Sequence, residues 1–378
     1  MRRALPALLA AALATACRRP TVDAGPRAET SAGSGATSAP STAPPPVEPP
    51  AAAAAAEVPP APSASAQRHA RAPAPPVVLP RALLSTLPSP GAHPSAGFTG
   101  PVDPALDAAW VSRLATAKVA TIAWNGGGVS LTFKLKLADG HRAVFKPAQA
   151  LPGSNHVAEI AAFHLDRLLG LGRVAVVVGR ALPADALADA VTDPKVASRV
   201  ARELAVRDGL VTGAMIAWHA APLTSDDPPR GWRASLSGEG PIDDAIRARA
   251  GELTDLALFD FLLDNTDRWS GGNVLSLGKG GPLVFLDNAS ALLPSRARRR
   301  ASLARELSQL CRFRRRAVDA VTAPRDLADE LARSVALDPS GARLEPVVVD
   351  ALRARVAALR EHLARCRREH GDGVWLDE

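Results

Sequence analysis

The distribution of proline and alanine divides the chain into two unequal parts, and this division most constrains what can fold. From about Arg18 to Pro94 the sequence is mostly Pro, Ala, Ser and Thr, with almost no large apolar residue. Such a composition cannot bury enough apolar surface to offset chain entropy, and proline-rich chains favour extended conformations. We therefore predict a disordered tether at residues 17–97. The remaining stretch of about 280 residues is long enough for a two-lobed domain with a substantial core.

The N-terminus has the pattern of an export signal. Arg2 and Arg3 precede an apolar run at residues 4–16 that is too short to cross a bilayer as a mature helix. Small residues directly before Cys17 resemble the lipobox of bacterial lipoproteins, in which that cysteine is acylated. We predict a signal peptide at residues 1–16, a lipid anchor at Cys17 and a place in the bacterial cell envelope. Arg18 weakly favours the outer membrane, and ordinary secretory cleavage is the alternative.

Export bears on the two other cysteines, Cys311 and Cys366. An oxidising compartment allows one disulfide between them, and the sequence leaves open whether it forms.

The formal net charge of +7 invites a nucleic-acid interpretation. The basic residues are mostly arginines spread over predicted helices, aromatic residues are not interleaved with them, and the sequence has no tyrosine, so we expect no nucleic-acid partner. The densest basic cluster favours a solvated helix face, with anionic lipid or an acidic substrate as the alternative. It comprises Arg296, Arg298, Arg299, Arg300, Arg312, Arg314, Arg315 and Arg316.

Hydrophobic periodicity predicts strands early in the domain and helices later. The Asp139-Gly140 pair between two apolar runs is a strong hairpin signal, and apolar residues at helical spacing mark the helices. Residues 183–252 show no clear pattern. The expected strands are 129–137, 141–145, 174–178, 273–277 and 283–286, and the expected helices are 157–169, 253–263 and most of 302–370.

Three glycines and a lysine supply the first candidate chemistry. Gly126, Gly127 and Gly128 precede the first strand, and Lys146 ends the second. Glycines let backbone amides approach phosphates closely, and a lysine adds positive charge. Alone, the set fits equally a loose turn and a solvated lysine.

Glu159 lies on the helix that follows this lysine. Kinases hold their strand lysine with a glutamate from a helix just downstream. A surface glutamate is the alternative.

Asp267, Asn273 and Asp287 form the most informative set, because they flank the second predicted hairpin in a fixed order. Phosphoryl transfer needs a carboxylate to accept or orient the attacking hydroxyl, and separate oxygen ligands for a divalent metal. We predict Asp267 as the base, and Asn273 and Asp287 as metal ligands. Otherwise Asp267 and Arg268 form a surface pair, and Asp287 begins an ordinary turn.

These motifs resemble the secretory-pathway kinases typified by the Golgi casein kinase, the glycosaminoglycan xylose kinase and the four-jointed kinases. The resemblance spans about residues 120–320, except 183–252. The similar segments are 143–147 (the phosphate-lysine strand), 155–169 (the glutamate helix), 259–268 (the catalytic segment), 285–288 (the metal-binding turn) and 310–314 (a cysteine-basic stretch).

The resemblance implies an α+β, two-lobed protein-kinase-like fold. Residues 98–215 would be a small β-rich N-lobe with one key helix, and residues 216–378 a mainly helical C-lobe. ATP with Mg²⁺ or Mn²⁺ would be the cofactors. Lys146 and the three glycines would bind phosphates, Glu159 would hold the lysine or the metal, Asp267 the acceptor hydroxyl, and Asp287 and Asn273 the metal.

Several residues depart from the family pattern. Asp264 and Ala289 stand where the family usually has glycine, and Trp269-Ser270 replaces histidines of eukaryotic members. The cysteine-rich insert of the animal enzymes is absent, so the acceptor is not inferred.

We therefore predict an ATP-dependent kinase that phosphorylates a hydroxyl of a protein Ser/Thr, a glycan or a small molecule. Its partners would be ATP, that acceptor and a membrane through Cys17, with the oligomeric state open. Because an exported protein meets little ATP, the alternative is a catalytically silent kinase-fold module that binds nucleotide or metal on the envelope.

Overall fold

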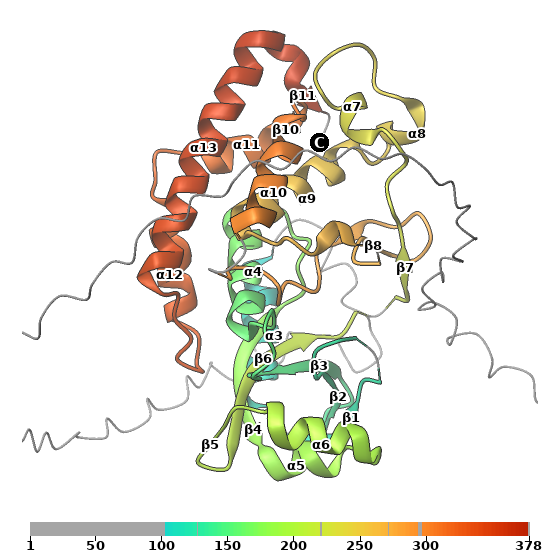
Figure 1. Cartoon of the computed structure of the whole chain (residues 1–378), viewed down its shortest axis with the longest axis vertical. Helices are drawn as coiled ribbons and strands as arrows, with labels where there is room; N and C mark the ends of the chain where they lie inside the picture. The colour runs from blue at the N-terminus through green and yellow to red at the C-terminus, as the bar shows by residue number, and fades with distance from the viewer. Residues whose placement is uncertain (1–102, 127, 220, 271, 294–296, 377–378) are drawn as a thin grey trace, which may run out of the picture. The chain divides into compact units, whose positions relative to one another are not determined.

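The computed structural model describes residues 103–376, except 127, 220, 271 and 294–296 (Figure 1). All of them belong to one compact unit, residues 72–378. The predicted signal peptide, the lipid anchor at Cys17 and the tether at 17–97 lie outside the described residues. Among the described helices, none combines the length and apolar character needed to cross a membrane.

An antiparallel sheet forms the first lobe, with strands in the order β1-β2-β3-β6-β4 and β5 paired to β6. Side chains of β2 alternate between buried and exposed, as expected of a sheet with one face on the core. Opposite Lys146 of β3 lies Ala214 of β6. The strands are β1 (Val119–Trp124), β2 (Phe133–Leu137), β3 (Arg142–Pro147), β4 (Val177–Pro183), β5 (Val206–Arg207) and β6 (Leu210–Ala217).

Helix α4 packs against this sheet and carries the key glutamate. It spans His156–Leu168, and the Asn155 side chain caps it by accepting a hydrogen bond from the Val157 amide at 3.0 Å. The Asn155 amide in turn donates to the Ala289 carbonyl at 2.8 Å. The start of α4 is thereby tied to the segment that follows Asp287.

The C-lobe is mainly helical. Helix α9 (Ala250–Leu263) is almost entirely buried. A small sheet of order β7-β8-β9 takes its first strand from before α9 in the sequence and the other two from after it. Strand β10 pairs in parallel with β11, which lies near the end of the sequence. Its other elements are β7 (Leu223–Ser225), α7 (Trp232–Ser235), α8 (Asp244–Arg247), η1 (Arg268–Ser270), β8 (Leu275–Leu277), β9 (Leu283–Val284), α10 (Ala297–Ser308), β10 (Phe313–Arg314), α11 (Arg315–Thr322), α12 (Leu327–Ala336), α13 (Pro346–His370), η2 (Gly371–Val374) and β11 (Trp375–Leu376).

The expected hairpins and helices are confirmed with small shifts at their ends. Strand β2 begins at Phe133 rather than 129, because residues 128–130 form bends. Residues 183–252, which had no clear pattern, contain α5 (Ala184–Asp189), α6 (Pro194–Glu203), β5, β6, β7, α7 and α8. The predicted division between lobes at 215/216 falls inside β6, which continues to Ala217.

Two hydrogen bonds join the C-terminal helices to the first lobe. Asp338, after α12, accepts from the Gly179 amide of β4 at 2.8 Å. Arg325, before α12, donates to the Leu168 carbonyl at the end of α4 at 2.7 Å. A side chain at Gly179 would collide with Asp338 and Ser340, so this close approach requires glycine.

Candidate active site

Lys146 and Glu159 meet at the centre of the site. Strand β3 carries the lysine and α4 the glutamate, with Lys146 Nζ 2.5 Å from Glu159 Oε1. Glu159 is 2% exposed, which excludes a surface glutamate. Beside the lysine, a Cβ at Gly213 would come within 2.5 Å of the Lys146 carbonyl oxygen. Glycine therefore permits the close pairing of β6 with this end of β3.

Asp287 is the second carboxylate on the lysine, with its Oδ1 2.7 Å from Lys146 Nζ. Burial alone would lower the pKa of Lys146, but the charges of Glu159 and Asp287 outweigh it and raise that pKa. The Lys146 charge in turn lowers the pKa of Asp287, against the effect of burial. The lysine and Asp287 are therefore both ionised at neutral pH.

Asn288 fixes the glutamate from the other side. Its backbone amide donates to Glu159 Oε1 at 3.0 Å, and its side-chain nitrogen reaches Glu159 Oε2 at 3.4 Å. Both carboxylate oxygens of Glu159 are thus engaged within the protein. Asp287 differs, because its side chain is 49% exposed and the contact with the lysine leaves Oδ2 uninvolved.

The loop that carries Asp267 is held by two asparagines. Asn265 Oδ1 accepts from the Asp267 amide at 3.2 Å, and Asn273 Nδ2 donates to the Asp267 carbonyl at 3.0 Å. The bond from Asn273 uses its amide nitrogen and does not involve Oδ1, the atom that can bind a cation. Asp267 itself is partly exposed.

Arg268 is the main element of the site that sequence reasoning missed. Its side chain is fully buried against Asp260 of α9, with a shortest distance of 3.1 Å. It also donates to Asn288 Oδ1 at 2.7 Å, to the Asn273 carbonyl at 3.2 Å and to the Leu286 carbonyl. Arg268 thereby fastens the Asp267 loop to the segment that ends in Asp287.

The surface-pair alternative for Arg268 is therefore wrong. A signal for its burial was present in the sequence, because Asp260 is an acidic residue within an otherwise apolar stretch of helix. Burial raises the pKa of Asp260 to about 6, although the Arg268 charge pulls it downward.

The glycine-rich loop joins β1 to β2. Gly126 and Gly128 have φ of 73° and 83°, and a Cβ at either would meet nothing within 4 Å. Gly127 lies outside the described residues. Gln149, also missed from sequence, holds the far side of the loop by accepting from the Leu131 amide at 2.9 Å and donating to its carbonyl at 3.1 Å.

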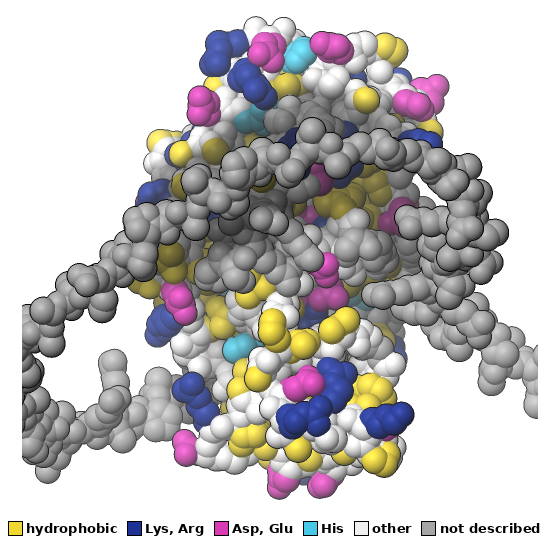
Figure 2. All heavy atoms as spheres, viewed as in Figure 1, with side chains coloured by type: hydrophobic (Ala, Val, Ile, Leu, Met, Phe, Trp, Pro, Cys, Tyr) yellow, Lys and Arg dark blue, Asp and Glu magenta, His cyan; other side chains and the backbone are white. Residues whose placement is uncertain are grey.

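The basic cluster is not a single solvated helix face. Arg312 is buried and donates to the Ser235 carbonyl at 3.4 Å, and Arg314 binds Asp255 at 2.8 Å. The expectation is therefore wrong for these two residues. Arg296 and the side chains of Arg298, Arg299 and Arg300 lie outside the described residues. On the face drawn in Figure 2, basic side chains are interspersed with acidic and hydrophobic ones.

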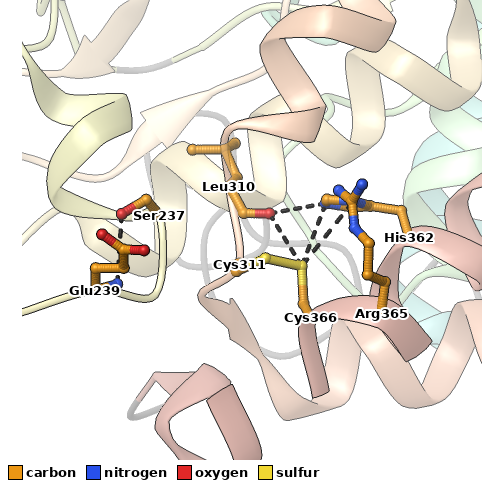
Figure 3. The surroundings of a disulfide bond; sticks show 7 residues. All are labelled: Ser237, Glu239, Leu310, Cys311, His362, Arg365 and Cys366. Carbon is orange, nitrogen blue, oxygen red and sulfur yellow. Dashed lines mark hydrogen bonds between the residues drawn. A yellow bond between two sulfur atoms is a disulfide. The ribbon is translucent and has the colours of Figure 1, made fainter. Parts of the chain in front are cut away.

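Cys311 and Cys366 are joined as a disulfide in the structure, with Cα atoms 5.1 Å apart. The bridge links the residue before Arg312 to helix α13 (Figure 3).

The chain is similar in sequence to several curated proteins. It is 26% identical to the pseudokinase FAM20A of Mus musculus over 65% of this chain and 56% of that protein. It is 28% identical to the four-jointed box protein 1 of Mus musculus over 70% and 65%, and 26% identical to the human glycosaminoglycan xylosylkinase over 70% and 76%. The chain thus spans less than two thirds of the length of the first two relatives.

Solved structures show the same fold. A crystal structure of the Golgi casein kinase aligns with a TM-score of 0.58 and 20% identity over 71% of this chain and 78% of that one. The structure of hydra Fam20 with sugar gives 0.57 and 21% over 73% and 94%. The α+β kinase-like fold is thereby confirmed. The family model described as "Golgi casein kinase, C-terminal, Fam20" matches residues 98–206 and 243–374. Since that match covers more than half of the chain, the protein belongs to the Golgi casein kinase (Fam20) family.

Proposed function

We propose that this chain is a metal-dependent kinase that transfers the terminal phosphoryl group of ATP to a hydroxyl of a protein Ser/Thr, a glycan or a small molecule. The observation that carries the proposal is the position of Lys146 Nζ, 2.5 Å from Glu159 and 2.7 Å from Asp287. Kinases require a strand lysine that is paired with a helix glutamate, and an aspartate that binds the metal nearby.

Related structures support the proposed cofactors. A Golgi casein kinase structure with Mn and ADP bound has a TM-score of 0.57 to this chain. Here the half-exposed Asp287 carboxylate and the Asn273 amide oxygen offer hard oxygen ligands, which suit Mg²⁺ or Mn²⁺. When bound, the ion would neutralise phosphate charge. Glu159 Oε2 has one contact, at 3.4 Å to the Asn288 side chain, so this oxygen could also bind the metal.

In this proposal Lys146 and the loop of Gly126 to Gly128 hold the phosphates, and Glu159 orients the lysine. Asp267 accepts the proton of the attacking hydroxyl. A bond forms between that hydroxyl oxygen and the terminal phosphorus, the bond from this phosphorus to the β–γ bridging oxygen breaks, and ADP leaves. Arg268, which follows Asp267, binds the residues on either side of Asp287 and so fixes the position of the base relative to the metal ligand.

The proposed location follows from the sequence alone. We propose a lipoprotein anchored through Cys17 in the bacterial envelope, with residues 17–97 as its tether. Metabolic labelling with a fatty acid tests this, since a Cys17→Ser variant should lose the label.

The activity test measures Mn²⁺-dependent ADP formation and autophosphorylation by the full chain. Lys146→Met, Asp267→Asn and Asp287→Ala should each lower turnover by about 10²-fold or more. Lys136→Met is a matched control, because this lysine is exposed on the neighbouring strand β2. It should keep full activity.

A silent module would give a different result. Nucleotide with Mn²⁺ would still raise the melting temperature, because a ligand of the folded state stabilises it, but no ADP would form. If the chain formed no ADP and nucleotide with Mn²⁺ caused no thermal shift, both the kinase and the silent-module hypotheses would be overturned.

A further inference from the structure

We propose that Cys311, His362 and Cys366 become a binding site for a soft divalent metal ion, such as Zn²⁺, when the disulfide is reduced. The site is separate from the residues proposed for phosphoryl transfer. One ligand atom from each of the three side chains lies within 4.8 Å of the others, and no ion is present. Thiolate and imidazole are the ligand types that Zn²⁺ prefers in proteins.

The imidazole is already close to the sulfurs. His362 Nε2 and Nδ1 lie 3.6 and 4.0 Å from Cys366 Sγ, and Figure 3 shows the ring beside the bridge. In a tetrahedral zinc site with bonds of about 2.0–2.3 Å, ligand atoms are roughly 3.3–3.8 Å apart. Reduction frees the two sulfurs to separate by side-chain rotation. Cys366 and Cys311 are 1% and 5% exposed, so the two sulfurs would be largely shielded from bulk solvent.

The surroundings of His362 suit a ligand. Its Nε2 lies 2.8 Å from the Leu310 carbonyl oxygen, to which it can only donate. The lone pair is then on Nδ1. Metal-binding histidines commonly donate their other ring N–H to a backbone carbonyl in this way, which fixes the ring. In the oxidised protein Arg365 donates to Nδ1 at 2.8 Å. Arg365 is on the exposed side of α13, so a metal ion could displace it.

A fourth ligand is available near Cys311. Glu369 and His370 each bring a ligand atom within 4.8 Å of the Cys311 sulfur. His362, Cys366 and His370 follow one another at four-residue spacing, which places them along one stripe of α13. Three protein ligands with water, or with one of these two residues, complete four-coordination.

Reduction and metal binding are two balanced steps. A water-soluble phosphine supplies two electrons to the S–S bond and becomes its oxide with oxygen from water, while the sulfurs take up two protons. Metal binding then releases the thiol protons. The bridge and the metal site exclude each other, so the oxidised chain has no such site.

The experiment titrates Co²⁺, as a spectroscopic probe for Zn²⁺, into the full chain with Asp287→Ala, which removes one of the proposed ligands of the other metal ion. After phosphine reduction under nitrogen, about one equivalent should produce a thiolate-to-cobalt charge-transfer band, and Zn²⁺ should abolish it. His362→Gln should weaken binding by about 10-fold or more. Arg365→Ala should bind equally or more tightly, because the competing donor is gone.

Glu361→Gln, an exposed neighbour on α13, is the control and should bind as the parent does. The proposal fails if the folded, reduced chain gives no charge-transfer band, if His362→Gln binds normally, or if the oxidised chain binds equally well. Should reduction unfold the domain, Zn²⁺ must restore its circular dichroism, because metal that binds the native state stabilises it. Absence of that recovery would also overturn the proposal.

Discussion

Arg268 lies fully buried beside Asp260, and every nitrogen of its guanidinium donates to a partner. Two of these partners belong to the Asp267 loop and to the segment after Asp287. Removing one member of a buried ion pair typically costs about 3–5 kcal/mol, because the other charge is left without compensation. This one side chain therefore links the proposed base to the proposed metal ligand.

Asp260 gives the protein a testable pH dependence. Its pKa is raised from 3.8 to about 6, so between these values the folded state holds a proton that the unfolded state has lost. The free energy of unfolding should therefore fall as pH rises through this window, by up to about 1.4 kcal/mol per pH unit for this group. Urea unfolding between pH of about 4 and 6 measures this slope.

The Asp260→Asn variant cannot bind that proton. Its free energy of unfolding should therefore fall less steeply with pH than that of the parent, by up to about 1.4 kcal/mol per pH unit. The slope should not vanish, because burial also raises the pKa of Asp255 to about 6. Equal slopes in the variant and the parent would contradict the assignment to Asp260.

Asp264 adopts a left-handed conformation, with φ of 59° and ψ of 37°, where α9 ends. Glycine is favoured at such a position because it has no Cβ. Asp264→Gly should therefore be more stable than Asp264→Ala by about 0.5–1 kcal/mol, or roughly a degree or two in melting temperature. Both variants lose the same carboxylate, and only alanine keeps the Cβ. Equal melting temperatures of the two variants would rule out backbone strain at this position.

At the level of elements, the cap of α4 offers a test of how the glutamate is positioned. Asn155→Ala removes the acceptor for the Val157 amide and should cost about 1 kcal/mol of stability. Because Glu159 lies in the first turn of this helix, turnover of ATP should also fall. Asp193→Ala removes the matching cap of α6 and should cost similar stability. If both variants lost turnover equally, the effect would not come from α4.

The elements with strong local patterns were predictable from the sequence. The hairpin around Asp139-Gly140 and helices α4 and α9 have turn signals or apolar periodicity that local sequence reveals. Strand β6 was not predicted. Its Gly213 packs closely on the Lys146 backbone of β3, and local sequence does not reveal such a contact between distant strands. The same holds within the site. Lys146, Glu159, Asp267 and Asp287 were named from sequence, whereas Gln149 and the role of Arg268 depend on tertiary contacts.

At the scale of the whole molecule, the disulfide closes a segment with a sequence separation of 55 between its ends. A bridge of this kind restricts the unfolded chain and typically contributes about 2–4 kcal/mol. The double variant Cys311→Ser with Cys366→Ser should lose about that much stability in urea unfolding. Glu361→Gln with Arg368→Gln, two exposed positions on the same helix, tests whether α13 is sensitive to any pair of changes. Loss of less than about 1 kcal/mol in the cysteine variant would contradict the prediction.

The Gly179 amide donates to Asp338, and Arg325 donates to the Leu168 carbonyl. These two bonds hold β4 and the end of α4 against the C-terminal helices. Many kinases are switched by swinging the glutamate helix outward. Such a swing would break the bond from Arg325 to the Leu168 carbonyl at the end of α4. This contact therefore favours the arrangement in which Glu159 already meets Lys146.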